Sequence, residues 1–146
     1  YYDDKYGHQI VFSDDMSHVI VYFDINSASG LTVWDINQHR AYPIFVENYL
    51  GEGNPKKIAL SPDNRYLAVG HFAIRVWDLH LLEPAYEDRL PIYRHEGPLP
   101  ISGIFGGEIT QLRFINNSII QTTANGSKIQ YWDLHTGELI NPESLP

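Results

Sequence analysis

Cysteine is missing from this sequence, which excludes a disulfide framework, a thiolate nucleophile and a cysteine-based zinc site. A long apolar run and a signal-like start are also lacking, so the sequence predicts an intracellular, cytoplasmic protein, with the nucleus left open, and no membrane partner. Basic residues are scarce, since 10 Lys and Arg stand against 18 Asp and Glu and the net charge is −8. Nucleic acids require clustered Lys and Arg, so we expect no nucleic-acid partner.

Sequence motifs of catalytic, phosphate-binding and metal-binding sites are scarce as well. The sequence has no nucleophile elbow, no phosphate-binding loop and no closely spaced histidine pair of the metal-ligand type. Carboxylates stand side by side at Asp3-Asp4 and Asp14-Asp15, but neighbouring residues on a strand point to opposite faces. General acid–base catalysis needs two carboxylates that face one bond. We therefore expect a protein that is not an enzyme, with no catalytic residue, no metal site and no cofactor.

What the sequence does have is a repeated pentad that ends in Trp-Asp. Its copies are Leu31–Asp35, Ile74–Asp78 and Ile129–Asp133, and they contain all 3 tryptophans of the chain. The tryptophans of the first two copies lie 43 residues apart, and those of the last two lie 55 apart. A recurrence of about 40 to 45 residues that ends in Trp-Asp is typical of a four-stranded propeller blade.

Each pentad follows the same hydrophobic frame around a polar turn. The frames are Phe12–Val21, Leu60–Val69 and Phe114–Thr122, and each predicts a strand, a tight turn and a second strand. The turn Ser61–Asn64 suits this because proline presets φ and Ser, Asp and Asn side chains bond the backbone. The clearest hairpin turn is Ala124–Ser127, since its Asn-Gly pair accepts positive φ.

On these residues the chain resembles a WD-repeat β-propeller over nearly its whole length, most closely in Ser61–Asp78. The resemblance implies an all-β fold of about three four-stranded antiparallel blades within a larger propeller, of the seven-blade type. We expect a single domain over 1–146, with blade one at about 9–46, blade two at about 55–93 and blade three at about 108–140. The expected strands are 9–13, 18–24, 30–35 and 41–46, then 56–60, 66–70, 73–78 and 90–93, and finally 108–114, 118–123, 128–133 and 138–140.

Three blades are too few to close a propeller, because closed propellers use roughly four to eight. The sequence also begins with Tyr1 rather than methionine and ends soon after the last Trp-Asp pair. We therefore expect a piece of a longer chain, completed by further blades of that chain or by oligomerisation. The stretch 25–29 is expected to form an exposed loop on the rim of blade one, longer than the equivalent turns.

In the resembled family a histidine, a Ser or Thr, an Asp and the Trp can form a buried hydrogen-bonded tetrad. The histidine position falls near Asp3, near Gly51 and near Phe105, so no blade here has the full set. Thr122 with Trp132 is the best remnant. We expect each indole to fill the space between blades and each aspartate to fix the turn that follows. These structural residues are Trp34, Asp35, Trp77, Asp78, Trp132 and Asp133.

The irregular part of the chain is a proline-rich insertion over 79–107. It accounts for the longer second spacing. Because proline cannot donate to a strand ladder, we expect much of it to be a loop or an edge strand. It has two readings that the sequence leaves open: a partner-binding insertion with the aromatic and arginine residues that anchor interfaces, or a variable connection without a role of its own. The candidate partner-binding residues, in this insertion and in two turns, are Phe72, Tyr86, Arg89, Tyr93, Arg94, His95 and Asn125.

Two functions from different classes fit this pattern. The resemblance implies a non-catalytic protein–protein interaction scaffold within a larger multi-protein assembly, with other proteins as partners. The alternative is a regulatory propeller that senses a ligand or recruits a substrate for a catalytic or nucleotide-hydrolysing domain outside these residues. A P-loop, kinase or F-box pattern elsewhere in the parent chain would favour the alternative, whereas further blades alone would favour the scaffold.

Overall fold

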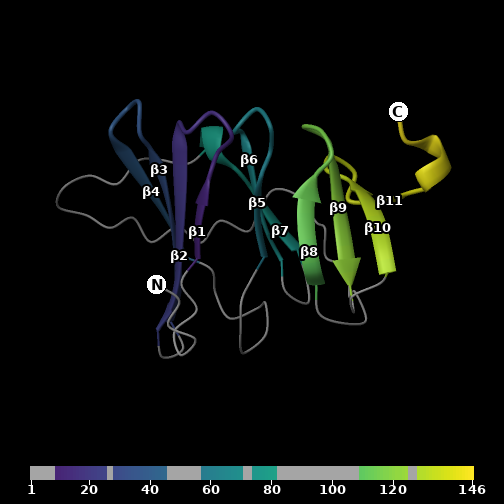
Figure 1. Ribbon diagram of the computed structural model, residues 1–146, viewed down its shortest axis with the longest axis horizontal. Helices are drawn as coiled ribbons and strands as arrows, with labels where there is room; N and C mark the ends of the chain where they lie inside the picture. The colour runs from purple at the N-terminus through teal and green to yellow at the C-terminus, as the bar shows by residue number, and fades with distance from the viewer. Residues whose placement is uncertain (1–8, 26–27, 46–56, 71–73, 82–108, 125–127) are drawn as a thin grey trace. The chain divides into compact units, whose positions relative to one another are not determined.

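The computed structural model describes residues 9–25, 28–45, 57–70, 74–81, 109–124 and 128–146. Every regular element in these residues is a β-strand or a short 3-10 helix (Figure 1). The chain divides into two compact units, of which the first contains β1 to β4 and the second contains β5 to β11. Each unit is described by itself below.

The first unit holds a four-stranded antiparallel sheet in the order β1-β2-β3-β4, coloured purple to blue in Figure 1. Val, Ile, Tyr and Phe recur along it, and such residues favour the pleated backbone. One face of the sheet is buried and carries Ile20, Tyr22, Leu31 and Val33, each at most 1% exposed. The strands are β1 (Gln9–Phe12), β2 (His18–Ile25), β3 (Ala28–Asp35) and β4 (Arg40–Phe45).

The turn between β2 and β3 is shorter than the sequence predicts. The expectation of a long loop over 25–29 is wrong, because Ile25 pairs with Ala28 and Asp24 with Ser29 in the antiparallel ladder. Small and hydroxyl side chains, which are weak strand formers, made the stretch look like a loop. Pairing with the strongly apolar β2 overrides that local preference.

The second unit contains two antiparallel sheets that share a core. The first has the order β5-β6-β7 and the second the order β11-β10-β9-β8, coloured teal and green to yellow in Figure 1. Strands β7 and β11 are each followed by one turn of 3-10 helix. The elements are β5 (Lys57–Leu60), β6 (Tyr66–Gly70), β7 (Ile74–Asp78), η2 (Leu79–Leu81), β8 (Ile109–Phe114), β9 (Ile119–Ala124), β10 (Lys128–Asp133), β11 (Leu139–Ile140) and η3 (Pro142–Ser144).

The core of the second unit forms where the two sheets meet face to face. Its first half comes from β6 and β7, and its second half from β8, β9, β10 and the residue after β10. Leu112 and Phe114 are partly buried at its border. Burial of apolar side chains between two sheets is the main stabilising term of such a core. The buried members are Tyr66, Ala68, Ile74, Val76, Ile109, Ile120, Ala124, Trp132 and Leu134.

The predicted fold class is confirmed: the described chain is all-β, and its sheets are antiparallel and blade-like. The sheets of blades one and three each have four strands. Blade two shows three, and its fourth strand, expected at 90–93, lies outside the described residues, as does most of the insertion 79–107. The blade boundaries stay predictions.

Candidate interaction surface

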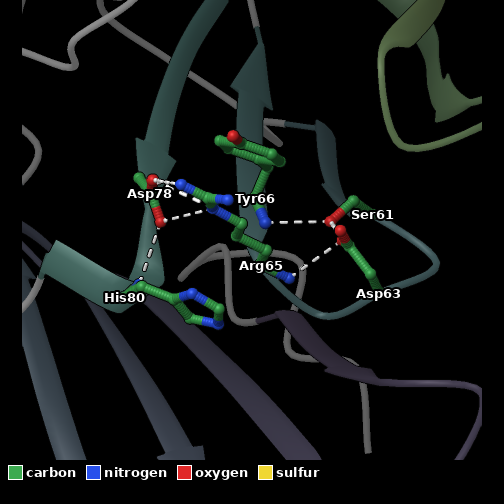
Figure 2. Close-up of polar contacts among 6 residues, drawn as sticks. All are labelled: Ser61, Asp63, Arg65, Tyr66, Asp78 and His80. Carbon is green, nitrogen blue, oxygen red and sulfur yellow. Dashed lines mark hydrogen bonds and ion pairs between the residues drawn. The ribbon is translucent and has the colours of Figure 1, made fainter.

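The turn between β5 and β6 is fixed by side chains that bond the backbone (Figure 2). The hydroxyl of Ser61 donates to Asp63 Oδ1 at 2.5 Å and accepts from the Tyr66 amide at 2.8 Å. Asp63 Oδ1 also accepts from the Arg65 amide at 3.2 Å. Asn64 adopts a positive φ of 60°, which asparagine tolerates better than most residues. The turn is therefore held by local bonds rather than by packing.

Arg65, the residue after this turn, forms an ion pair with the aspartate of the second Trp-Asp pair. Its Nη2 lies 2.8 Å from Asp78 Oδ2, and its Nε lies 3.2 Å from Oδ1 and 3.1 Å from Oδ2. The Asp78 side chain is 7% exposed and that of Arg65 is 43% exposed. Two nitrogens of the planar guanidinium thus fit the two carboxylate oxygens, while the rest of the group faces solvent.

The surroundings of Asp78 keep it charged. Burial acts to raise the pKa of Asp78, but hydrogen bonds from the Arg65 side chain and the His80 amide outweigh it and leave the pKa below its usual value. The His80 amide donates to Asp78 Oδ1 at 3.0 Å. The bond to Asp78 likewise raises the pKa of Arg65. The pair is therefore a charged element just before the start of β6 and at the end of β7.

Two further contacts join the β5–β6 turn and Tyr66 to the sheet of blade three. The amide of Asp63 donates to Asn117 Oδ1 at 3.1 Å, which ties the β5–β6 turn to the β8–β9 turn 54 residues away. The Tyr66 ring lies 5.0 Å from the Arg65 guanidinium carbon and meets the His135 ring edge-on at 6.3 Å between centroids. Both ring contacts are attractive, since the guanidinium lies over the tyrosine ring and the two rings meet edge to face.

The result is a partly exposed surface built from segments that are distant in the sequence. We call it the rim of the second unit, and it presents charged, imidazole and amide groups to solvent on a backbone that hydrogen bonds hold in place. Its residues are Pro62, Asp63, Arg65, His80, Asn117 and His135.

Blade one repeats the same turn with a weaker ion pair. Ser13 donates to Asp15 Oδ1 at 2.7 Å and accepts from the His18 amide at 2.9 Å, as Ser61 does in blade two. Ser17 stands at the position of Arg65, and the contact with the aspartate comes from the next residue, His18, whose Nε2 lies 3.8 Å from Asp35 Oδ2. Imidazole offers no bidentate fork, so this contact orients the carboxylate less firmly than Arg65 orients Asp78.

Each aspartate of the Trp-Asp pairs accepts backbone hydrogen bonds from the turn that follows it. Asp35 Oδ1 accepts from the Gln38 amide at 2.9 Å. Asp133 Oδ1 accepts from the amides of His135 and Thr136, both at 2.8 Å. The Thr136 amide bond is the main cause of a lowered pKa for Asp133, with burial opposing it and the His135 amide adding to it. These carboxylates organise turns, and they do not converge on one site.

The three indoles differ in their surroundings. Trp77 and Trp132 are 2% and 8% exposed, whereas Trp34 is 49% exposed. Trp132 Nε1 donates to the Thr122 hydroxyl at 3.0 Å. The Trp77 Nε1 is buried without a hydrogen-bond partner in the described part of the chain. The expectation that each indole fills the space between blades stays a prediction.

All seven candidate partner-binding residues named from the sequence lie outside the described residues, so they stay predictions. They are Phe72, Tyr86, Arg89, Tyr93, Arg94, His95 and Asn125. Sequence reasoning missed the rim. The signal that could have found it is the shared Ser-x-Asp turn, since Ser13 and Asp15 stand in blade one where Ser61 and Asp63 stand in blade two.

Within the described ranges, no cluster of three or more His, Cys, Asp or Glu side chains could hold a metal ion. The carboxylates of the rim already accept hydrogen bonds from the turns. What the arrangement offers is a rigid, mixed-charge surface suited to binding. In the same ranges, no helix has the length and apolarity needed to span a bilayer.

These antiparallel sheets with a repeated Trp-Asp strand define a segment of β-propeller fold. A comparison of solved structures agrees: the β-propeller domain of Cps50 (Swd1) from Myceliophteria thermophila superposes with a TM-score of 0.55 at 12% identity. The match covers 92% of this chain and 38% of that chain, so the likeness concerns the fold. No protein-family model matches the sequence. No curated protein matches it either.

Proposed function

We propose that this chain is a non-catalytic interaction scaffold that binds other proteins within a larger assembly. The rim of the second unit is the observation that carries the proposal. Its six residues come from two sheets, and side-chain hydrogen bonds to the backbone hold the turns in one shape. A surface that is ordered before binding loses less conformational entropy when a partner docks.

The composition of the rim also suits a protein partner. Arginine is enriched at interfaces, and the Arg65 fork is held in place while part of it remains exposed. His80 and His135 add exposed rings that can donate, accept or stack. The net charge of −8 supports proteins rather than nucleic acids as partners.

The fold supports this role by analogy. We propose that the chain is a WD-repeat relative and part of a larger propeller, on the strength of its Trp-Asp pentads and its likeness to the Cps50 (Swd1) β-propeller domain. Such folds present their turns on the two ends of the ring and host many unrelated functions. The proposed binding role therefore rests on the rim and not on the fold. We propose an intracellular setting, cytoplasmic or nuclear, because the chain has no cysteine.

The test is quantitative co-purification of the native protein from its own cells in three forms. The first is wild type, the second is His80→Ala combined with His135→Ala, and the third is Glu143→Ala, an exposed change outside the rim. We expect a defined set of proteins that the wild type and Glu143→Ala retain and that falls at least tenfold with the double variant. Equal melting temperatures would show that the loss is not caused by unfolding.

Two results would contradict the proposal. If the double variant recovered every partner as well as the wild type does, the rim would not be the binding surface. Turnover of a small molecule by the purified protein, abolished by replacing one acidic or histidine side chain, would show an enzyme instead.

A further inference from the structure

The guanidinium of Arg65 is a planar group with one edge and one face already occupied (Figure 2). Its Nε and Nη2 atoms bond the two carboxylate oxygens of Asp78 along one edge of the plane. One face lies over the Tyr66 ring, with the guanidinium carbon 5.0 Å from the ring centroid. The Arg65 side chain is nevertheless 43% exposed. What Arg65 offers to a partner is therefore the second face of the plane, together with Nη1.

A carboxylate of a partner is a poor occupant of this place. To take the Nε–Nη2 edge it would have to displace Asp78, which is 7% exposed and would be left as a buried, unpaired charge. Asp78 already balances the charge of Arg65, and Asp63 adds a negative charge to the rim. The net charge of −8 also repels an acidic partner. An uncharged group that stacks on the free face meets none of these costs.

The neighbours of Arg65 on the rim are flat groups as well. The His135 ring meets the Tyr66 ring at 6.3 Å and an interplanar angle of 81°, so it stands beside the stack of Arg65 on Tyr66. His80 follows Asp78 closely, and its amide donates to Asp78 Oδ1 at 3.0 Å. Both histidines are exposed. Imidazole and guanidinium groups of this kind suit contact with an aromatic ring.

We propose that the rim binds an aromatic side chain on a peptide segment of the partner protein, and that this ring stacks on the exposed face of the Arg65 guanidinium. The guanidinium would then lie between two rings, with Tyr66 on one face and the partner on the other. Cation–π contact makes this stack attractive, and Asp78 holds the plane so that little side-chain freedom is lost on binding. His80 and His135 contact the rest of the segment. The inference rests on the proposed function, because it names the group that the rim binds.

Arg65→Lys separates stacking from charge. Lysine keeps the positive charge and can still pair with Asp78, but it has no planar face on which a ring can stack. Binding of an anion by Arg65 would survive this change, whereas stacking would not. Arg113→Lys is the matched control, because Arg113 is exposed and its Nε donates to Gln121 Oε1 at 2.7 Å outside the rim.

The test starts from random peptides displayed on phage, which are selected for binding to the native protein purified from its own cells. Peptides that also bind the variant with His80→Ala and His135→Ala are discarded, so the remaining peptides depend on the rim. We expect these peptides to share an aromatic residue. In fluorescence anisotropy, changing that residue to leucine should raise the Kd by about tenfold or more, and Arg65→Lys should raise it by about fivefold or more. Arg113→Lys should leave the Kd unchanged.

Four results would overturn the inference. Rim-dependent peptides without an aromatic residue would mean another class of partner, and the proposed function would stand. Acidic peptides that still bind Arg65→Lys would make Arg65 an anion receptor. An aromatic peptide with the same Kd for Arg65→Lys and wild type would place the ring elsewhere. If no peptide depends on the rim, the aromatic anchor is rejected, and the co-purification test decides separately whether the rim binds proteins.

The leucine change in the peptide guards against a structural effect of Arg65→Lys, because it leaves the protein unaltered. If Arg65→Lys lowered the melting temperature, the comparison of the aromatic peptide with its leucine form on wild-type protein would decide. An equal Kd for the two peptides would reject the aromatic anchor.

Discussion

Trp132 Nε1 donates to the Thr122 hydroxyl at 3.0 Å, and this buried bond ties β10 to β9 inside the core of the second unit. Blade two has no such bond. By register, Trp77 pairs with Leu67 as Trp132 pairs with Ile120, so the position equivalent to Thr122 is Val69. A methyl group stands where a hydroxyl would be, and the Trp77 Nε1 is left without a partner among the described residues.

Val69→Thr should therefore be tolerated unusually well. A threonine hydroxyl buried without a partner normally destabilises a protein by about 1–3 kcal/mol. At position 69 the hydroxyl would accept a hydrogen bond from Trp77 Nε1, and this bond would offset the cost of burying the hydroxyl. We expect the free energy of unfolding to stay within about 1 kcal/mol of wild type or to rise. Urea denaturation measures it, with Val76→Thr as the control, since Val76 is fully buried on the other face of the sheet. A larger loss for Val69→Thr than for Val76→Thr would contradict the assignment.

Stability should fall in acid because two carboxylates have lowered pKa values. The pKa of Asp78 and that of Asp133 lie below their unfolded value of about 3.8. The charged forms are favoured in the folded state, so their contribution is present above that pH and is lost as pH falls through the folded pKa values. We expect the urea midpoint to decline from about pH 4 downward.

The Asp78→Asn variant isolates the share of one residue in this acid response. Asparagine cannot titrate, so we expect lower stability at pH 7 and a shallower decline between about pH 4 and pH 2. An unchanged slope in Asp78→Asn would show that Asp78 is not a source of the acid sensitivity.

The β1–β2 turn holds a methionine in an unfavourable backbone conformation. Met16 has a φ of 58°, as Asn64 has 60° at the equivalent position of blade two, and Met16 is 59% exposed. A non-glycine residue in this region is destabilised by about 1–2 kcal/mol, and asparagine by less. Met16→Asn should raise the free energy of unfolding by about 0.5–1 kcal/mol, and the reciprocal Asn64→Met should lower it. Equal stabilities measured by urea denaturation would refute this explanation.

The Arg65–Asp78 pair can be measured by a double-mutant cycle with Arg65→Met and Asp78→Asn. The geometry involves two guanidinium nitrogens and a carboxylate that is 7% exposed, so we expect a stronger coupling than an exposed surface pair gives. The equivalent cycle at His18 and Asp35, whose Nε2 and Oδ2 atoms are 3.8 Å apart, should give a weaker coupling. Coupling at His18 equal to that at Arg65 would contradict the role given to the guanidinium fork.

The strands and turns could be predicted from the sequence because their causes are local. Apolar alternation and turn residues placed β5, β6 and the Ser61–Asn64 turn within a residue or two. The secondary structure of the stretch 25–29 could not be predicted, because it depends on the pairing of β2 with β3. The rim also depends on distant partners: Asp63 and Asn117 stand 54 residues apart, and no spacing rule brings them together.

The exposure of Trp34 could not be predicted from the sequence either. Its pentad has the same pattern as those of Trp77 and Trp132, an apolar first residue and a final Trp-Asp pair. Whether an indole is covered depends on which sheet lies against it, and that information is not in the repeat itself. The bond between Thr122 and Trp132 could be anticipated from the resemblance, since a Ser or Thr bonds the Trp in the resembled family. In the register Thr122 pairs with Gln130 and lies diagonal to Trp132.

Proline at position 43 has a consequence for how this protein can aggregate. Pro43 lies in β4, the outer strand of its sheet, opposite Thr32, and it has no amide hydrogen to offer a fifth strand. At the corresponding place in blade three, β11 is only two residues long and is followed closely by Pro142. Both outer edges are thus poor templates for an extended peptide, which disfavours amyloid-like growth and partner recognition by strand addition.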